Sequence, residues 1–263
     1  MTPIIKIRNL CKRFKDPIHR GEWLEIVRGV DLDVEQGQVV AIMGGSGSGK
    51  STLLRCMSLM IEPDEGTVEI DGIKIPAKEY SRERTWQIIE LGKKVGVVLY
   101  SRNLLPSLTV LENMIERPTV EKKWPQERAI AKAEELLDWI GLLDQRDNYP
   151  HQLSDSQQQR IAIVRELAMD PKVMLLDEPT AALYPELSGE VIEVMEQVVG
   201  QGMTMIVVSR RVRFVRNVAH RVIFMDDGRF VEQAPPDEFF SNPQDERTRR
   251  FLDQILKNNR GAS

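Results

Sequence analysis

The sequence has few of the features that mark secreted or nucleic-acid-binding proteins. Its 263 residues include only two cysteines, Cys11 and Cys56. Two thiols this far apart make neither a disulfide framework nor a metal-spaced set, so a reducing compartment is expected. The formal net charge of −4 leaves no broad basic surface for nucleic acid. We therefore predict no nucleic-acid partner.

Long apolar runs are scarce as well. No stretch approaches the ~18 apolar residues that a membrane span needs. The N-terminal sequence MTPIIKIRNL lacks the cationic start and long apolar run of a signal peptide. If the protein works at a membrane, we expect it to do so through a partner. The overall composition, 41% hydrophobic and 29% charged, is ordinary for a globular protein with one large or two unequal domains.

Short apolar runs are present and predict buried strands. Continuous runs at residues 39–43 and 173–176 are typical of strands covered on both faces of a parallel sheet. Residues 204–209 and 221–228 predict further strands. Apolar residues at helical spacing follow them. These predict helices from Leu53 to Ile61, from Pro125 to Gly141 and from Pro185 to Gly200. Alternating strands and helices predict an α/β protein with a parallel sheet.

Two segments depart from this alternation. EGTVEIDG (65–72) alternates in polarity between glycines, which predicts a β excursion outside the parallel sheet. Residues 101–168 are mostly helical in pattern and predict an inserted helical subdomain. We therefore expect one domain, in which residues 1–100 and 169–240 form the core and 241–263 a C-terminal helix.

A glycine-rich segment, GGSGSGKS (44–51), directly follows the apolar run 39–43 and precedes a predicted helix. It matches G-x-x-x-x-G-K-[ST] in the strand–loop–helix context that this phosphate-binding motif requires. Its backbone N–H groups and the helix N-terminus face phosphate oxygens, the lysine reaches the β and γ phosphates, and the serine ligates Mg²⁺. A glycine-rich turn without a ligand is the alternative, and the agreement of motif and context disfavours it. The predicted ATP-binding residues here are Gly44, Gly45, Ser46, Gly47, Ser48, Gly49, Lys50, Ser51 and Thr52.

Two acids follow the buried run in VMLLDEPT. Asp177 and Glu178 come at the carboxyl end of the predicted strand, where open α/β sheets bind ligands. Asp177 is predicted to hold Mg²⁺ together with Ser51, and Glu178 to polarise an attacking water as the catalytic base. The alternative is a pair of helix-capping acids before Pro179.

Three stretches, residues 27–56, 168–180 and 235–252, resemble the ATP-binding subunits of ABC transporters. The resemblance runs nearly end to end and is greatest to importers of polar amino acids. It implies a P-loop NTPase (ABC ATPase) core with a parallel sheet, an antiparallel β subdomain and an inserted helical subdomain. It also implies ATP and Mg²⁺ as cofactors and a peripheral location on the cytoplasmic face of the cell membrane.

The resemblance further implies partners. Two such subunits, identical or different, pair head to tail, and each ATP lies between the phosphate-binding loop of one and the signature turn of the other. Ser154 and Gln157 belong to that turn, and Phe14 stands where the family stacks an aromatic on adenine. The insertion 16–23, DPIHRGEW, makes the register of Phe14 an open question, with a core or edge aromatic as the alternative. Membrane permease subunits and an extracytoplasmic solute-binding protein are also expected.

The sequence departs from the family pattern at four of its chemical motifs. Tyr100 replaces the Mg²⁺-sensing glutamine, the signature LSGGQ reads LSDSQ, Tyr184 replaces an aspartate, and Arg210 replaces a histidine. Asp155, in the signature, is expected to cap its own helix and to repel a triphosphate. Two unit charges about 4 Å apart repel by on the order of 4 kcal/mol at an effective dielectric near 20.

These departures predict a subunit that binds ATP and hydrolyses it slowly. A fully active import ATPase, in which the remaining groups suffice, is one alternative. A regulatory ATP-binding module without transport is another; an ABC protein of DNA repair or translation is disfavoured, because those usually carry long insertions or tandem cassettes. The basic run RRVRFVR (210–216) predicts a solvated helix face, with an acidic-lipid or nucleic-acid patch as its alternative.

Overall fold

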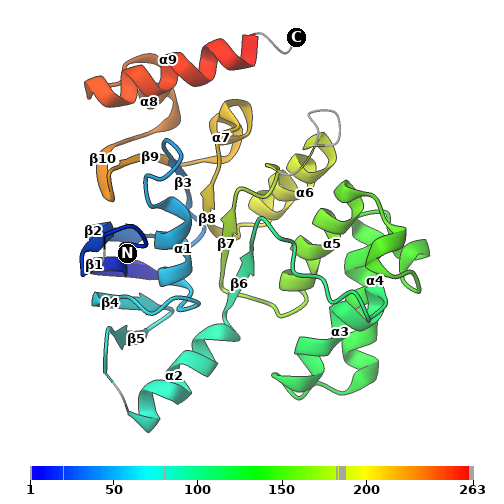
Figure 1. Cartoon of the computed structure of the whole chain (residues 1–263). Coiled ribbons are helices and arrows are strands. Elements are labelled where there is room, and N and C mark those ends of the chain that lie inside the picture. Colours follow the sequence, from blue (N-terminus) through cyan, green and yellow to red (C-terminus); the bar gives the residue numbers. More distant parts are fainter. Residues whose placement is uncertain (1, 20, 80, 182, 184–187, 261–263) are drawn as a thin grey trace.

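The structure is a computed structural model that describes residues 2–19, 21–79, 81–181, 183 and 188–260. A six-stranded sheet in the order β10-β9-β3-β8-β7-β6 runs through the molecule (Figure 1). All neighbouring strands pair in parallel except β10 and β9. Its strands are β3 (Val39–Met43), β6 (Val95–Val98), β7 (Val173–Asp177), β8 (Thr204–Val208), β9 (Arg221–Asp226) and β10 (Arg229–Ala234). The predicted α/β fold with a parallel sheet is confirmed.

A second, antiparallel sheet has the order β2-β1-β4-β5. Its strands are β1 (Ile5–Lys15), β2 (Trp23–Val34), β4 (Glu65–Ile70) and β5 (Ile73–Pro76). The β excursion predicted at 65–72 contains β4 and the turn after it, and β5, which was not predicted, completes a hairpin. Asp71 and Gly72 in that turn both have positive φ, as a tight hairpin turn requires. The long strands β1 and β2 were not predicted, because bulges between Ile7 and Arg13 interrupt the alternation of polarity that marks a strand.

The two faces of the parallel sheet contribute to two separate cores. Along β3, Val39, Ala41 and Met43 face one apolar cluster, and Val40 and Ile42 face the other. The first cluster includes the apolar faces of the helices on one side, and the second includes the antiparallel sheet. Because side chains of a strand alternate between faces, burial on both sides produces the continuous apolar run VVAIM.

The helices are α1 (Lys50–Met57), α2 (Arg82–Gly92), α3 (Val110–Val120), α4 (Gln126–Trp139), α5 (Asp155–Leu167), α6 (Ser188–Gly200), α7 (Val212–Val218), α8 (Pro236–Ser241) and α9 (Glu246–Arg260). Short 3₁₀ helices cover Leu143–Gln145 and Pro150–Gln152. Helices α3, α4 and α5 pack together on one side of the sheet (Figure 1). Among the described residues, no helix is both long and apolar enough to cross a membrane.

The helix predicted from Leu53 to Ile61 ends earlier, at Met57. Leu59 has a φ of 57°, and the N–H of Ile61 donates a hydrogen bond to the carbonyl of Arg55 at 3.1 Å. A residue in the left-handed conformation closes the helix here, as it does at many helix C-termini. The predicted helix from Pro125 is confirmed as α4, whereas the start of the third one at Pro185 lies outside the described residues.

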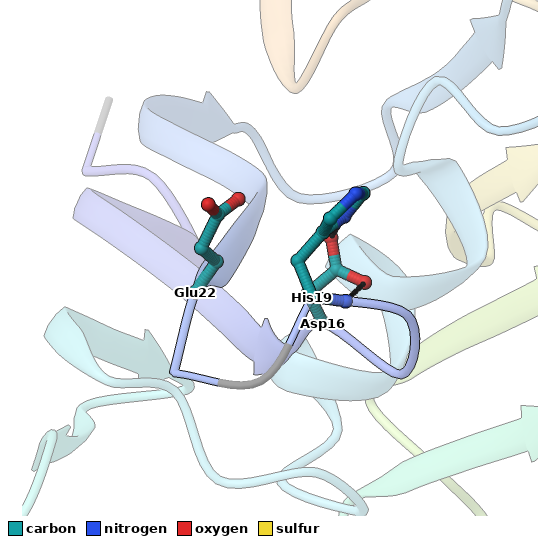
Figure 2. Close-up of side chains that lie close together, drawn as sticks. All are labelled: Asp16, His19 and Glu22. Atoms are coloured by element: carbon teal, nitrogen blue, oxygen red, sulfur yellow. Dashed lines mark hydrogen bonds and ion pairs between the residues drawn. The ribbon is translucent and has the colours of Figure 1, made fainter.

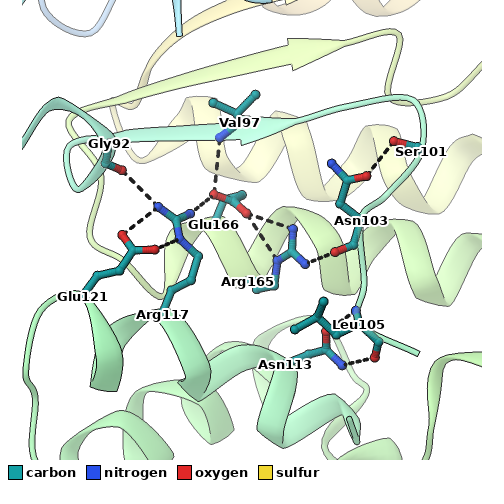
Figure 3. A network of polar contacts seen from close by, with 10 residues as sticks. All are labelled: Gly92, Val97, Ser101, Asn103, Leu105, Asn113, Arg117, Glu121, Arg165 and Glu166. Atoms are coloured by element: carbon teal, nitrogen blue, oxygen red, sulfur yellow. Dashed lines mark hydrogen bonds and ion pairs between the residues drawn. The ribbon is translucent and has the colours of Figure 1, made fainter. Parts of the chain in front are cut away.

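A buried carboxylate joins the helical side of the molecule to the sheet (Figure 3). Glu166 of α5, whose side chain is 4% exposed, lies 2.6 Å from the guanidinium of Arg117 on α3 and 3.1 Å from that of Arg165. The same carboxylate accepts the N–H of Val97 on β6 at 3.4 Å. Arg117 also donates to the carbonyl of Gly92 at the end of α2. One acid therefore bridges α3, α5 and the edge strand of the parallel sheet.

Candidate nucleotide site

The predicted phosphate loop lies between β3 and α1. Lys50 is buried, with 7% of its surface exposed. Its Nζ donates to the carbonyls of Gly44 (3.0 Å) and Gly45 (2.6 Å) and to Oγ of Ser48 (3.1 Å). These bonds hold the ammonium group across its own loop, whose tip residues Ser46 and Gly47 are exposed. The loop therefore forms a ring around one fixed positive charge.

At two positions of this loop, the neighbouring backbone leaves no room for a side chain. A Cβ on Gly44 would lie 2.2 Å from the carbonyl oxygen of Met225, and one on Gly49 would lie 2.4 Å from that of Ile26. Gly49 also has a φ of 100°, which L side chains rarely adopt. The loop is thus pressed against β2 and the end of β9, and only glycine fits at these two positions.

The first turn of α1 is available to an anion. Gly49 is its N-cap and provides no side-chain hydrogen bond to the N–H groups of this turn. A helix N-terminus without a side-chain cap leaves N–H donors and the positive end of the helix dipole for a ligand. Thr52, also predicted to bind ATP, lies in this turn. The arrangement suits phosphate oxygens.

Ser51 and Asp177 meet at the bottom of the loop. The Ser51 hydroxyl donates to Oδ1 of Asp177 at 2.8 Å, although the residues are 126 positions apart. Asp177 ends β7 and is almost fully buried. A hydroxyl and a carboxylate oxygen are hard ligands of the kind that Mg²⁺ takes beside phosphates. The pair that the sequence assigned to the metal is therefore together and chemically suited to it.

Glu178 is held in a defined position beside this pair. Its backbone has a φ of 49°, and its N–H donates to the carbonyl of Val208 at the end of β8 at 2.9 Å. Its carboxylate, in a side chain 16% exposed, lies 3.1 Å from Nε of Arg210. Burial raises the pKa of Glu178, and the positive charges of Arg210 and Lys50 partly offset that rise. Burial likewise lowers the pKa of Lys50, and the Glu178 carboxylate partly offsets that change.

Arg210 thus contacts the predicted catalytic base. The resemblance indicated only that a histidine is missing at this position, and the ion pair with Glu178 was not predicted. The three histidines make contacts away from the loop: His19 with Asp16, His151 with Tyr149, and His220 Nδ1 with the N–H of Val39. None of these contacts involves the phosphate loop or Glu178.

The signature turn differs from expectation. Asp155 does not cap α5: Ser154 is the N-cap, its Oγ accepts the N–H of Gln157 at 3.2 Å, and the Gln157 side chain accepts the N–H of Ser154 at 2.9 Å. Asp155 instead pairs with Arg102 at 2.6 Å. The expectation of a self-capping Asp155 is wrong, because the serine before it occupies the capping position. The negative charge of Asp155 has a counter-charge that the sequence did not reveal.

The other departures lie around this turn. The hydroxyl of Ser156 donates to Glu190 on α6 at 2.6 Å. Tyr100 follows β6, is exposed, and lines a surface hollow with Pro150 and His151. Tyr184 lies outside the described residues.

Phe14 lies on β1 opposite Leu24, 39% exposed, with Nζ of Lys12 5.2 Å from its ring centre. A hollow beside Gly47 is lined by Arg13, Trp23 and Asp227 among others. Trp23 is the last residue of the insertion 16–23 and is exposed. It was not among the predicted site residues. Adenine stacking by Phe14 stays a prediction, and Trp23 is an aromatic that lines the hollow beside Gly47.

In the insertion, one possible metal-ligand atom from each of Asp16, His19 and Glu22 lies within 4.8 Å of the other two (Figure 2). Asp16 already accepts the backbone N–H groups of Ile18 (2.7 Å) and His19 (3.1 Å) and contacts Nδ1 of His19. These bonds, the backbone ones foremost, lower the pKa of Asp16. A turn whose first residue accepts backbone N–H groups with its side chain has this pattern of hydrogen bonds, so the cluster is explained without a metal ion.

Comparisons with known proteins agree with this geometry. A family model described as ABC transporter matches residues 27–181. The L-cystine transport system ATP-binding protein TcyN of Escherichia coli (strain K12) is 45% identical over 252 residues, which cover 96% of this chain and 98% of that protein. The arginine transport ATP-binding protein ArgV of Corynebacterium glutamicum is 45% identical over 261 residues, with the same coverage. A dimeric structure of the bacterial ABC transporter cassette MJ0796 has a TM-score of 0.77 and 31% identity, covering 88% of this chain and 98% of that chain.

Proposed function

The chain belongs to the ABC transporter family, and from this premise we propose that it is the ATP-binding subunit of an importer of polar amino acids. The observation that carries the proposal is the complete phosphate loop with Ser51 and Asp177 in contact behind it. Relatives whose names refer to cystine and arginine transport support polar amino acids as the solute class.

In this proposal the chain binds MgATP through its own residues. Lys50 and the N–H groups of residues 44–52 bind the phosphates, and Ser51 and Asp177 hold Mg²⁺. The metal neutralises phosphate charge when bound. Glu178 orients and polarises the attacking water, and the elevated pKa of its buried carboxyl makes it a stronger base than an exposed glutamate.

The proposal includes slow hydrolysis. Arg210 forms an ion pair with the carboxylate of Glu178. The signature residues Ser154 and Gln157 are hydrogen-bonded to each other. Tyr100 has no amide carbonyl to face a metal or its water. A fully active import ATPase remains the first alternative, and a regulatory ATP-binding module without transport the second.

The proposed partners follow from the same premise. The subunit pairs with a second ATP-binding subunit, identical or different, as the dimeric cassette does. Permease subunits bind its helical side, and a solute-binding protein completes the system. The chain then lies peripherally on the cytoplasmic face of the membrane. We retain the division into core (1–100, 169–240), helical subdomain (101–168) and C-terminal helix (241–263) as part of this proposal.

The loop is tested with Lys50→Ala. The variant loses a charge-assisted phosphate contact, so MgATP should no longer raise its melting temperature, whereas it raises that of the parent chain. Lys132→Ala, on the outer helix α4 where Lys132 pairs with Glu135, is the matched control and should respond like the parent. Equal stabilisation of Lys50→Ala and its parent would remove this loop as the nucleotide site.

Turnover and partners are tested together. The tagged chain is purified from membranes with the proteins that it binds, and ATPase activity is measured with and without them. A permease in the complex supports the importer, and its absence supports the regulatory module. Turnover within a few-fold of an intact transporter would contradict slow hydrolysis and support the active import ATPase.

A further inference from the structure

Four cations lie close together where the turn between α3 and α4 meets the segment before β7. They are Lys122 and Lys123 of the turn, Arg128 of α4, and Lys172, which directly precedes β7. The Nζ of Lys122 donates to the carbonyl of Met169, and this bond joins the turn to the segment that follows α5. We call these four residues the basic patch.

The basic patch has few acids to balance it. Burial lowers the pKa of Lys122; the carboxylate of Asp170 opposes this change, and three cations, Arg128, Lys172 and Arg117, add to it. Within the ranges that the structure describes, none of the four patch residues forms an ion pair. The patch is therefore a local excess of positive charge on a chain whose formal net charge is −4.

Apolar surface lies among these charges. The guanidinium carbon of Arg128 is 3.8 Å from the ring centre of Trp124, and Nζ of Lys122 is 5.5 Å from it. Trp124 itself is half-buried, and Val120 at the end of α3 is 54% exposed. Cations beside an indole and an aliphatic side chain are the composition that favours the boundary between water and lipid, where an apolar body and a polar tip are both accommodated.

The freedom of the charges favours a membrane surface over a small ligand. Lys123 and Lys172 are exposed, belong to different segments, and have no partner that fixes their ammonium groups. Long, free side chains suit headgroups that move in the plane of a membrane, whereas a small anion needs several fixed donors around one point. A membrane surface also accepts Val120 and Trp124, which a nucleic-acid backbone would leave in water.

We propose that the basic patch docks the subunit onto anionic phospholipid headgroups beside the permease. The inference deepens the proposed function and rests on it, because only a subunit held at the cytoplasmic face of a membrane meets those headgroups. Helices α3 and α4 belong to the helical side that we assign to the permease (Figure 1). The same side of the subunit then contacts both the permease and the lipid around it.

Co-sedimentation of the purified full chain with vesicles at low salt tests this docking. Vesicles of equal parts phosphatidylcholine and phosphatidylglycerol should bind the chain, vesicles of phosphatidylcholine alone should not, and added salt should release it. Lys123→Gln with Lys172→Gln should weaken binding to the anionic vesicles about thirtyfold, because each cation near such a surface adds to the attraction.

Arg213→Gln with Arg229→Gln is the matched control. It removes the same charge from exposed positions on α7 and β10, so it should bind the anionic vesicles like the parent. The melting temperatures of both double variants should equal that of the parent, which separates loss of docking from loss of fold. An equal loss of binding in both double variants would overturn the patch in favour of net charge, and equal binding of the parent to both kinds of vesicle would overturn the role of charge.

The outcomes also separate the docking from the proposed function. If the parent chain binds neither kind of vesicle while a permease is purified with it from membranes, the docking is wrong and the proposed function is unaffected. If no permease is purified with the chain while anionic vesicles bind it through the basic patch, the importer proposal fails and the lipid contact is confirmed.

Discussion

At the scale of the residue, burial decides which reactive groups a reagent can reach. Cys56 on α1 is fully buried beneath the antiparallel sheet, and burial raises the pKa of its thiol to about 12. Cys11 on β1 is only partly buried. Because the thiolate is the nucleophile, both the missing access and the raised pKa protect Cys56.

We therefore expect a thiol-specific disulfide reagent at pH 8 to label Cys11 in the native chain and Cys56 only after unfolding. Titration with and without denaturant measures this. Cys11→Ser should abolish labelling of the native chain, and Cys56→Ser should leave it unchanged. Rapid labelling of Cys56 in the native chain would mean that α1 separates readily from the sheet.

At the scale of the element, one carboxylate holds several segments together. Glu166 compensates the guanidinium groups of Arg117 and Arg165 and binds the N–H of Val97 (Figure 3). The pKa of Arg117 is raised by its bonds to Glu121 and Glu166, against the opposing effect of burial. Since Arg117 keeps Glu121 as a second partner, Arg165 loses most if Glu166 is removed.

Glu166→Ala should lower the free energy of unfolding by about 3 kcal/mol, because breaking a buried ion pair leaves charge without a partner. Urea denaturation measures the change. Glu135→Ala, on the exposed face of α4, removes a pair open to solvent and should cost less than about 0.5 kcal/mol. Glu166→Gln keeps the shape of the side chain and removes its charge. If this variant lowers the free energy of unfolding by as little as Glu135→Ala does, the charge of Glu166 is not what stabilises the fold.

At the scale of the whole molecule, the proposed dimer places the signature turn of one subunit against the ATP of the other. An unpaired Asp155 would repel the partner's triphosphate. The Arg102 guanidinium 2.6 Å away provides a counter-charge, so the repulsion is smaller than the sequence alone suggested. Arg102 is thus part of the proposed dimer surface, although it does not belong to the signature motif.

In a Glu178→Gln background, which retards hydrolysis in the proposed mechanism, Arg102→Gln should weaken MgATP-dependent dimerisation by about tenfold. The double change Arg102→Gln with Asp155→Asn should restore it to the level of Asp155→Asn alone. Analytical ultracentrifugation with and without MgATP measures the dimer fraction. If Arg102→Gln has the same effect whether or not Asp155 is charged, the ion pair is not what matters at the dimer surface.

The sequence by itself determined the features that depend on neighbours in the chain. The phosphate loop, the buried strands β3 and β7 and the helix α4 were predicted from local runs and spacing, and the family resemblance is confirmed by the match over residues 27–181. Such features are local because a strand buried on both faces, or a loop that curls around phosphate, needs a particular run of residue types.

Only the tertiary structure decided which distant side chains meet. Ser51 and Asp177 were assigned to one metal, and the fold brings them to 2.8 Å. The pairs Glu178–Arg210 and Asp155–Arg102 were not predicted, since each joins segments 32 or 53 positions apart that no local pattern connects. Charge pairing across a fold depends on how strands and helices are ordered in space, and that order is set by packing of both sheet faces rather than by the residues adjacent in the chain.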